Sequence, residues 1–267
     1  LATFAGCGSS SGDGDSGGWR DAPVVPEITG RLKEQLRQDV AVADLHGFRA
    51  NVFAKVGDSN TELSDNLYGF GCRPVEYSEH ADMQPVVAKY SEVTINATGE
   101  PGCEPVNSFS RLSAATRSGT YSTFPTTKIR DYITPFSGPD PACDPEETPL
   151  SCEIRLLKPR YTIIMTGTND LGMDQQLGGI EPGSKAAERI GILIAAIRLA
   201  GSVPVLSNLP PAWVPQTPAV DEWGGVVRSN ERIAAIADAT QVPLINLWGG
   251  LMEEGMIDRG LGPDGIH

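Results

Sequence analysis

The sequence predicts an α/β fold, a three-layer α/β/α arrangement around a central, mostly parallel sheet. Short apolar runs alternate with longer helical patterns over the second half of the chain. These runs are apolar along almost their whole length, which is typical of strands buried on both faces. Strands that alternate with helices form parallel sheets with helices on both sides. Ligands of such sheets bind at the carboxyl ends of the strands.

The first half of the chain contains one clear strand and one long irregular segment. We expect a helix from Pro26 to Gln38 and a buried strand from Arg49 to Val56, which ends at Gly57. The segment from Gly71 to Cys152 is rich in proline and shows no sustained period. It is interpreted as loop insertions around one or two strands, and loops at this edge of a sheet commonly shape substrate access.

The second half predicts a regular succession of elements. The first helix there has a serine at its start that can cap it and a glycine directly after its end. The expected elements are a strand at Tyr161 to Thr166, a helix at Ser184 to Ala200 before Gly201, a strand at Val203 to Ser207, a helix at Asp221 to Thr240 and a strand at Val242 to Leu247.

Composition and charge exclude several classes of function. The chain has 267 residues, is 40% hydrophobic and 21% charged, and carries a formal net charge of −13. A strongly acidic chain is a poor partner for nucleic acid or for an anionic membrane surface. The sequence has no run of 18 apolar residues, so no transmembrane helix is expected. Nucleic acid is therefore not expected as a partner, and a membrane only through a possible N-terminal lipid anchor.

The N-terminus indicates export. Phe4-Ala5-Gly6-Cys7 resembles a bacterial lipobox, in which the cysteine becomes acylated, and a tether rich in Gly, Ser and Asp follows. We expect residues 1–20 to be a lipobox remnant and tether, Cys7 to be lipidated, and the protein to be anchored in the cell envelope or released outside it. The alternative is a chance Ala-Gly-Cys. Residues 21–267 then form one domain, with an insertion at about 71–152.

The other cysteines also fit an exported protein. Cys72, Cys103, Cys143 and Cys152 form no C-x-x-C pair, which makes a zinc or thioredoxin-like site a weak interpretation. Four cysteines in an exported chain predict two disulfides, with three possible connectivities. We expect Cys72–Cys103 and Cys143–Cys152, the pairing that closes the shorter loops. Free buried thiols are the alternative.

Three short motifs carry the groups needed for acyl transfer. Ser59 follows the first predicted strand and is a nucleophile only if a base removes its proton. His267 is the expected base, and Asp264 orients it. Asn169, together with the backbone N–H of Ser59, can stabilise the oxyanion. No metal or cofactor is needed for this chemistry. Each motif alone is weak, because Gly-Asp-Ser is a common turn, Asn169 could cap a helix, and His267 could be an exposed tail residue.

Taken together, the motifs resemble those of the SGNH hydrolase superfamily, also called GDSL-like lipases and esterases. Gly57-Asp58-Ser59 is similar to the block that supplies the nucleophile, and Gly167-Thr168-Asn169-Asp170 to the block that supplies an oxyanion-hole amide. Asp264-Gly265-Ile266-His267 is similar to the block of the acid and base. Arg228 to Arg232, followed by Val242 to Ile245, resembles the penultimate helix and last strand. The resemblance covers about Phe48 to His267 and implies the flavodoxin-like three-layer fold of the family.

The chain departs from the family pattern in its second block and at its end. The best match to the second block is Ser110 to Thr116, which places Ala114 where the family has the glycine of the oxyanion hole. Gly119 is the fallback for this role. The family also continues beyond its histidine, so we expect the sequence to be truncated after His267.

The resemblance implies a serine ester hydrolase that acts on a carboxylic ester or a carbohydrate O-acetyl ester. The expected partner is thus a small-molecule or polysaccharide ester substrate. The alternative that shares the fold is a non-catalytic surface lipoprotein that binds carbohydrate. A second alternative, an unrelated nucleotide-binding protein, lacks a phosphate loop, because the only G-x-G-x-x-G lies in the tether with no strand before it.

Overall fold

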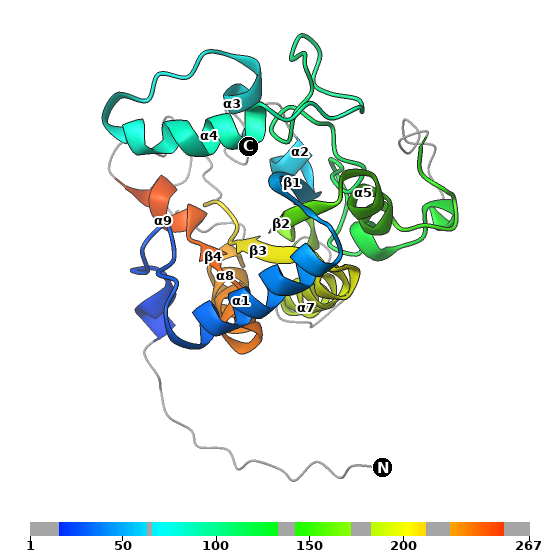
Figure 1. Ribbon diagram of the computed structural model, residues 1–267. Coiled ribbons are helices and arrows are strands. Elements are labelled where there is room, and N and C mark those ends of the chain that lie inside the picture. Colours follow the sequence, from blue (N-terminus) through cyan, green and yellow to red (C-terminus); the bar gives the residue numbers. More distant parts are fainter. Residues whose placement is uncertain (1–15, 63–65, 133–141, 172–182, 212–224, 254–267) are drawn as a thin grey trace, which may run out of the picture.

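The fold was examined in a computed structural model, which describes residues 16–62, 66–132, 142–171, 183–211 and 225–253 (Figure 1). Cys7, Asp264 and His267 lie outside the described residues. The expectations for the lipid anchor and for the acid and base therefore rest on the sequence alone. Ser59, Ala114, Gly119, Asn169 and the other four cysteines are all described.

A four-stranded parallel sheet forms the centre of the molecule. It consists of β1 (Arg49–Gly57), β2 (Pro159–Met165), β3 (Val203–Ser207) and β4 (Leu244–Ile245), in that spatial order. In the register, Gly57 lies opposite Met165, so β1 and β2 end level with each other. The loops that follow these two strands must therefore be neighbours, and they carry Ser59 and Asn169. The predicted α/β class with a parallel sheet is confirmed.

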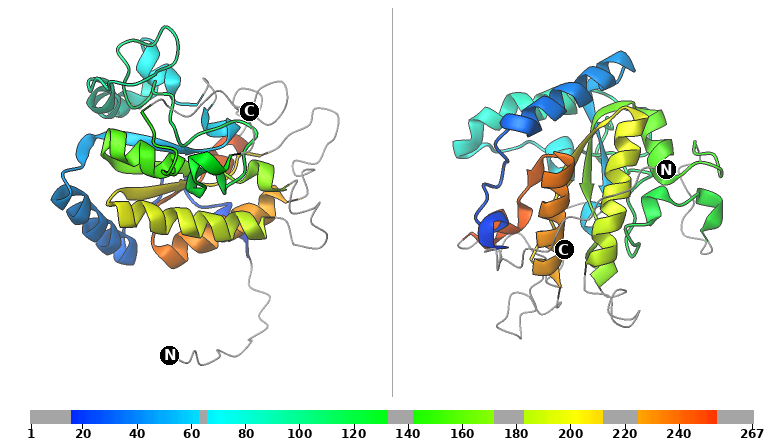
Figure 2. Two further views of the ribbon diagram at one scale, coloured as in Figure 1. Left: turned by 90° about the vertical axis from the view of Figure 1, so that its right-hand side faces the viewer. Right: turned by 90° about the horizontal axis from the view of Figure 1, so that it is seen from below.

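Three helices cover one face of the sheet and build the largest core (Figure 2). They are α5 (Pro149–Leu157), α7 (Ser184–Ala200) and α8 (Val226–Thr240). Val56, Ile164 and Leu206 face them from successive strands, and all three are fully buried. The alternation of side chains along a strand places these positions on a single face.

The opposite face of β1 packs against α4 (Gln84–Ser91) and the chain around Phe109. Phe53 and Phe109 meet edge to face with their ring centroids 5.0 Å apart, next to Val87 of α4. Aromatic rings prefer such geometry to face-to-face stacking. With helices on both faces, the fold has the expected three layers.

The helix α1 (Gly30–Leu45) packs against β2 and β3. Arg198, in the last turn of α7, donates to the buried Asp39 of α1 at 2.9 Å and so ties the two helices together. α1 begins and ends later than the predicted Pro26 to Gln38, because its sequence of good helix formers continues to Leu45. It ends before Gly47, whose φ of +69° suits glycine.

The N-cap of α7 and the length of β4 also differ from the prediction. α7 has the predicted bounds, but Gly183 is its N-cap and Ser184 is its first residue, so Ser184 does not cap it. β4 has two residues rather than six, because Asn246 caps the short helix α9 (Leu247–Met252) by accepting the N–H of Gly249 at 3.0 Å. The polar cap thus ends the strand early.

The segment 71–152 is irregular, as predicted, but its described residues contain no strand. They contain isolated bridges instead, from Gly99 to Arg111 and from Thr116 to Gly57 of β1. Shorter helices in the described residues are η1 (Ser16–Trp19), α2 (Ser59–Glu62), α3 (Tyr68–Cys72), η2 (Ser78–Met83), η3 (Phe124–Thr126) and η4 (Ile129–Asp131).

Both predicted disulfides are present. Cys72 bonds to Cys103, and Cys143 bonds to Cys152 in α5. They link loops of the segment to helices, which reduces the conformational freedom of the unfolded chain. Disulfides are typical of exported proteins. Within the described ranges, no helix is both long and apolar enough to span a bilayer.

Candidate active site

The nucleophile candidate, Ser59, lies directly beyond the carboxyl end of β1. It is the first residue of α2, and its exposed fraction is 9%. Gly57 allows the tight approach that precedes it, since a Cβ there would lie 1.9 Å from the carbonyl oxygen of Met165. Thr61 donates its hydroxyl to the same oxygen at 2.7 Å. The turn that carries Ser59 is therefore fixed to the end of β2.

Asp58 joins this turn to the loop after β2. Its Oδ2 accepts the backbone N–H groups of Gly167 and Thr168 at 3.1 and 3.2 Å, and its Oδ1 accepts that of Asn60 at 3.2 Å. The residue is 1% exposed. Gly167 has a φ of +123°, a conformation that favours glycine. One buried carboxylate thus holds together the loops that carry Ser59 and Asn169.

Burial determines the acidity of this carboxyl group. Removal from water raises the pKa of Asp58 to about 6, although the three backbone N–H groups favour the charged form. The buried Asp170 raises the pKa further. The carboxyl group of Asp58 therefore gains its negative charge at a higher pH than an exposed aspartate does.

Further hydrogen bonds reinforce the junction. The side-chain amide of Asn60 donates to the hydroxyl of Thr168 at 3.0 Å, and Asn66 donates to the carbonyl of Asn60 at 2.6 Å. Ser59 is therefore flanked on both sides by residues with fixed partners. Such fixed surroundings reduce the reorganisation that a reaction at Ser59 would need.

Asn169, the expected oxyanion donor, is oriented by Thr120. Its side-chain nitrogen donates to the carbonyl oxygen of Thr120 at 2.9 Å. A carboxamide nitrogen carries two hydrogens, so this bond fixes the amide and leaves a second N–H for another acceptor. Residues 168–171 are helical, which places Asn169 on the first turn after β2.

Asp170 anchors the segment 120–122 to the same turn. It is fully buried and accepts from both the hydroxyl and the backbone N–H of Ser122, at 2.7 and 2.9 Å. Arg189 of α7 forms an ion pair with it at 2.5 Å. Two successive residues, Asn169 and Asp170, thus hold one loop against the carboxyl end of β2.

Ala114, the expected second oxyanion donor, is directed elsewhere. Its backbone N–H donates to the carboxylate of Glu153 at 2.9 Å. Glu153 is also bound by two nitrogens of Arg111, at 2.9 and 2.8 Å, and both side chains of this ion pair are 1% exposed. The described geometry therefore does not favour Ala114 as an oxyanion donor, because its N–H already serves a buried charge.

Gly119, the fallback, is the sequence neighbour of the residue that binds the amide of Asn169. It directly precedes Thr120, whose carbonyl holds that amide, and it has a φ of +73°. Among the described residues its N–H makes no hydrogen bond. These observations favour Gly119 over Ala114 for the second-block role.

Several residues of this site were not identified from the sequence. Asp58 is part of the Gly-Asp-Ser motif, but its clamp on Gly167 and Thr168 depends on strand register. Glu153 lies 39 positions from Ala114, and no local pattern connects them. In the described parts of the chain, no group of three or more His, Cys, Asp or Glu side chains could hold a metal ion.

The C-terminal part of the chain matches a known family. Residues 145–267 match the model of the GDSL-like lipase/acylhydrolase family. The match relates this part of the chain to that family. The predicted SGNH relationship is confirmed, and the matched residues include Asn169 as well as Asp264 and His267. Ser59, Ala114 and Gly119 precede the matched region.

A solved structure and the curated proteins were also compared. A GDSL-like lipase from Bacteroides thetaiotaomicron is 15% identical, with a TM-score of 0.43, and the alignment covers 89% of this chain and 88% of that one. No curated protein matches the chain.

Proposed function

We propose that the protein is a serine ester hydrolase, in keeping with the acylhydrolase family of its C-terminal part. The observation that carries the proposal is the buried carboxylate of Asp58. It joins the turn of Ser59 to the loop of Asn169, so that a nucleophile and an amide donor share one edge of the sheet. Acyl transfer needs both groups at one carbonyl.

In this proposal the hydroxyl oxygen of Ser59 attacks the ester carbonyl, and His267 accepts the hydroxyl proton. Collapse of the tetrahedral intermediate breaks the bond to the leaving alcohol, which receives that proton from His267. Water then attacks the acyl-enzyme by the same route and releases the acid. Asp264 orients His267 and stabilises the imidazolium. The roles of Asp264 and His267 come from the sequence motif.

The developing oxyanion requires hydrogen-bond donors that are already in place. We assign this role to the second N–H of the Asn169 side chain and to the backbone N–H groups of Ser59 and Gly119. The bond from Asn169 to Thr120 supports the assignment, because it holds the amide in one orientation. Removal of one such donor typically lowers kcat by about 10² to 10³.

The proposed substrate is a carboxylic ester or an O-acetyl ester of a carbohydrate. The proposed location is outside the cytoplasm, in the cell envelope or beyond it, with a lipid on Cys7. The two disulfides support export. No cofactor enters the mechanism.

Hydrolysis of p-nitrophenyl acetate tests the mechanism. Ser59→Ala and His267→Ala should each abolish it, because the first removes the nucleophile and the second removes the base. Ser91→Ala in α4 and the exposed His46→Ala are matched controls and should retain wild-type activity. Retained activity in either active-site variant would exclude the mechanism.

A second candidate is a non-catalytic protein that uses the fold to bind carbohydrate. The ion pair that engages the N–H of Ala114 is the observation that favours it, since it leaves the second block without its usual donor. The two candidates differ in the reactivity of Ser59. A fluorophosphonate labels only an activated serine, so an unlabelled but folded protein would favour the binding function.

A further inference from the structure

A pocket lies at the end of the sheet opposite to Ser59. Its volume is about 620 Å³. It forms where β1 begins and α5 ends, whereas Ser59 follows the last residue of β1. The polar residues that line it include Arg49, Thr94, Asn96, Thr98, Arg155 and Lys158.

Basic residues line this pocket. Arg49 and Lys158 contribute positive charges, and neither has an ion-pair partner among the described residues. In a chain with a net charge of −13, two uncompensated cations in one concavity are unusual. Both Nε and Nη2 of Arg49 donate to the carbonyl of Leu157, at 2.8 and 2.6 Å. This fixes the guanidinium and leaves its Nη1 hydrogens for a ligand.

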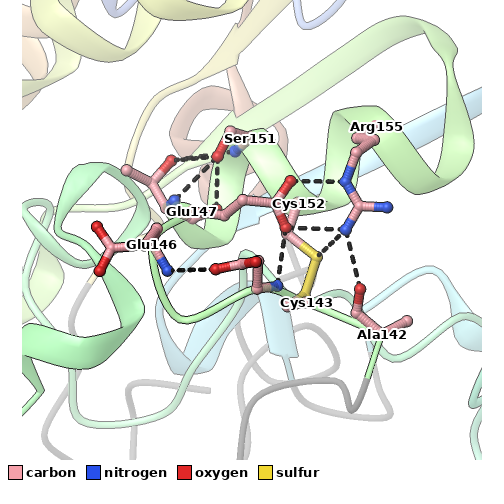
Figure 3. Close-up of polar contacts among 9 residues, drawn as sticks. Ala142, Cys143, Glu146, Glu147, Ser151, Cys152 and Arg155 are labelled. Carbon is pink, nitrogen blue, oxygen red and sulfur yellow. Dashed lines mark hydrogen bonds and ion pairs between the residues drawn. A yellow bond between two sulfur atoms is a disulfide. The ribbon is translucent and has the colours of Figure 1, made fainter.

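Arg155 also lines the pocket, and its polar contacts are drawn in Figure 3. Its guanidinium binds both carboxylate oxygens of Glu147, at 2.6 and 2.8 Å, and the carbonyl of Ala142 at 2.9 Å. The disulfide Cys143–Cys152 links the loop of Ala142 to α5. The orientation of the Arg155 guanidinium is thus fixed before a ligand binds. Such preorganisation lowers the conformational entropy that is lost on binding.

The pocket is also lined by uncharged polar residues. Thr94, Asn96 and Thr98 are exposed and alternate with the less exposed Ile95 and Ala97, which line the pocket too. Hydroxyl and amide side chains both donate and accept hydrogen bonds. This is the chemistry that matches the hydroxyl groups of a sugar, while the cations match a carboxylate.

We propose that this pocket is a second binding site, for an acidic sugar unit of a polysaccharide. The carboxylate lies against Arg49 and Lys158, and the ring hydroxyls face Thr94, Asn96 and Thr98. The volume is within the range of small-ligand sites and is much larger than a lone phosphate needs. Because the site lies at the far end of β1 from Ser59, it binds independently of hydrolysis.

Calorimetric titration of the full chain with trigalacturonate, maltotriose and inorganic phosphate tests the proposal. We expect trigalacturonate to bind with a Kd of about 1 mM or lower. Its binding should weaken as the salt concentration rises, because salt screens exposed charges. Maltotriose and phosphate should bind at least about tenfold more weakly. Equal binding of phosphate or of maltotriose would overturn the assignment to an acidic sugar, as would no binding of trigalacturonate.

Variants locate the binding. Lys158→Gln should raise the Kd for trigalacturonate about tenfold, since it removes one charged hydrogen-bond donor. Lys33→Gln, the same change at an exposed position of α1, should have no effect. Both variants should hydrolyse p-nitrophenyl acetate at the wild-type rate, which separates this proposal from the one for Ser59. Wild-type affinity in Lys158→Gln would overturn the proposed site.

Discussion

The carboxylate of Asp58 accepts the backbone N–H of Thr168 at 3.2 Å, across 110 positions of the chain. Asp58 follows β1 and Thr168 follows β2, and the level ends of these neighbouring strands make the contact possible. The bond links the residue before Ser59 to the residue before Asn169. The geometry of the candidate site therefore depends on one buried carboxylate.

Asp58→Asn tests this dependence. An asparagine keeps the shape but turns an NH₂ toward N–H donors, so at least one backbone donor loses its acceptor. A buried donor without a partner costs about 1–3 kcal/mol of unfolding free energy. We expect that loss in urea denaturation and a fall of at least about tenfold in kcat, because a small displacement of reacting groups is costly. Asp21→Asn, at an exposed position, should change neither quantity.

The same variant has a predictable dependence on pH. The pKa of Asp58 is raised to about 6 in the folded protein, from an ordinary value of 3.8. Between these values the folded protein binds a proton that the unfolded chain has released, so this group destabilises the fold as pH rises from about 4 to about 6. Relative to Asp58→Asn, the free energy of unfolding of the wild type should fall by about 3 kcal/mol over that pH range. A constant difference between the two unfolding curves would show that the pKa is not raised.

Asn169→Ala tests the oxyanion donor. The change removes the amide that Thr120 holds, and kcat should fall by about 10² to 10³ with little change in KM, because the lost bond acts mainly in the transition state. Asn51→Ala, at an exposed position of β1, is the matched control. A rise in KM at unchanged kcat would instead assign Asn169 to substrate binding.

Separate substitutions at positions 114 and 119 test the second oxyanion donor. Ala114→Gly should leave kcat within about twofold of wild type, because the N–H at 114 serves Glu153 rather than the substrate. Gly119→Ala should lower kcat, since alanine disfavours the φ of +73° there. Gly119→Asn should recover part of the loss, because asparagine tolerates this conformation. A gain in activity from Ala114→Gly alone would instead assign the second oxyanion donor to position 114.

Breaking the buried ion pair of Arg111 and Glu153 should lower the free energy of unfolding more than breaking an exposed pair. Glu153→Gln leaves Arg111 charged and buried without its carboxylate, which costs about 3–5 kcal/mol. Glu146→Gln breaks an exposed pair with Lys128 and Arg130 and should cost less than about 1 kcal/mol. Urea denaturation of the two variants measures the contrast, and equal losses would contradict it.

The fold and the disulfides could be predicted because their signals are local. Continuous apolar runs identified β1, β2 and β3, and loop length favoured the pairing of the cysteines. The end of α1 was missed because its run of good helix formers continues to Leu45, and the end of β4 was missed because it depends on a cap. Asn246 ends β4 by capping the next helix, and its side chain also donates to the carbonyls of Trp19 and Ala22, far away in the sequence.

The candidate site was predictable only in part. Ser59 and Asn169 are marked by motifs, but whether they are neighbours depends on strand order and register, which no short motif encodes. The partner of the Ala114 N–H depends on α5 packing behind the second block. Residues that act through distant partners, such as Asp58 and Glu153, therefore required the structure.

The most direct test of the central claim is reaction of the protein with a fluorophosphonate, followed by mass spectrometry of its peptides. We predict a single phosphonylated residue, Ser59, and no labelling of folded Ser59→Ala. Labelling should also be lost in His267→Ala, because the base activates the serine. A folded wild-type protein without label at Ser59, or with the label on another serine, would contradict the account.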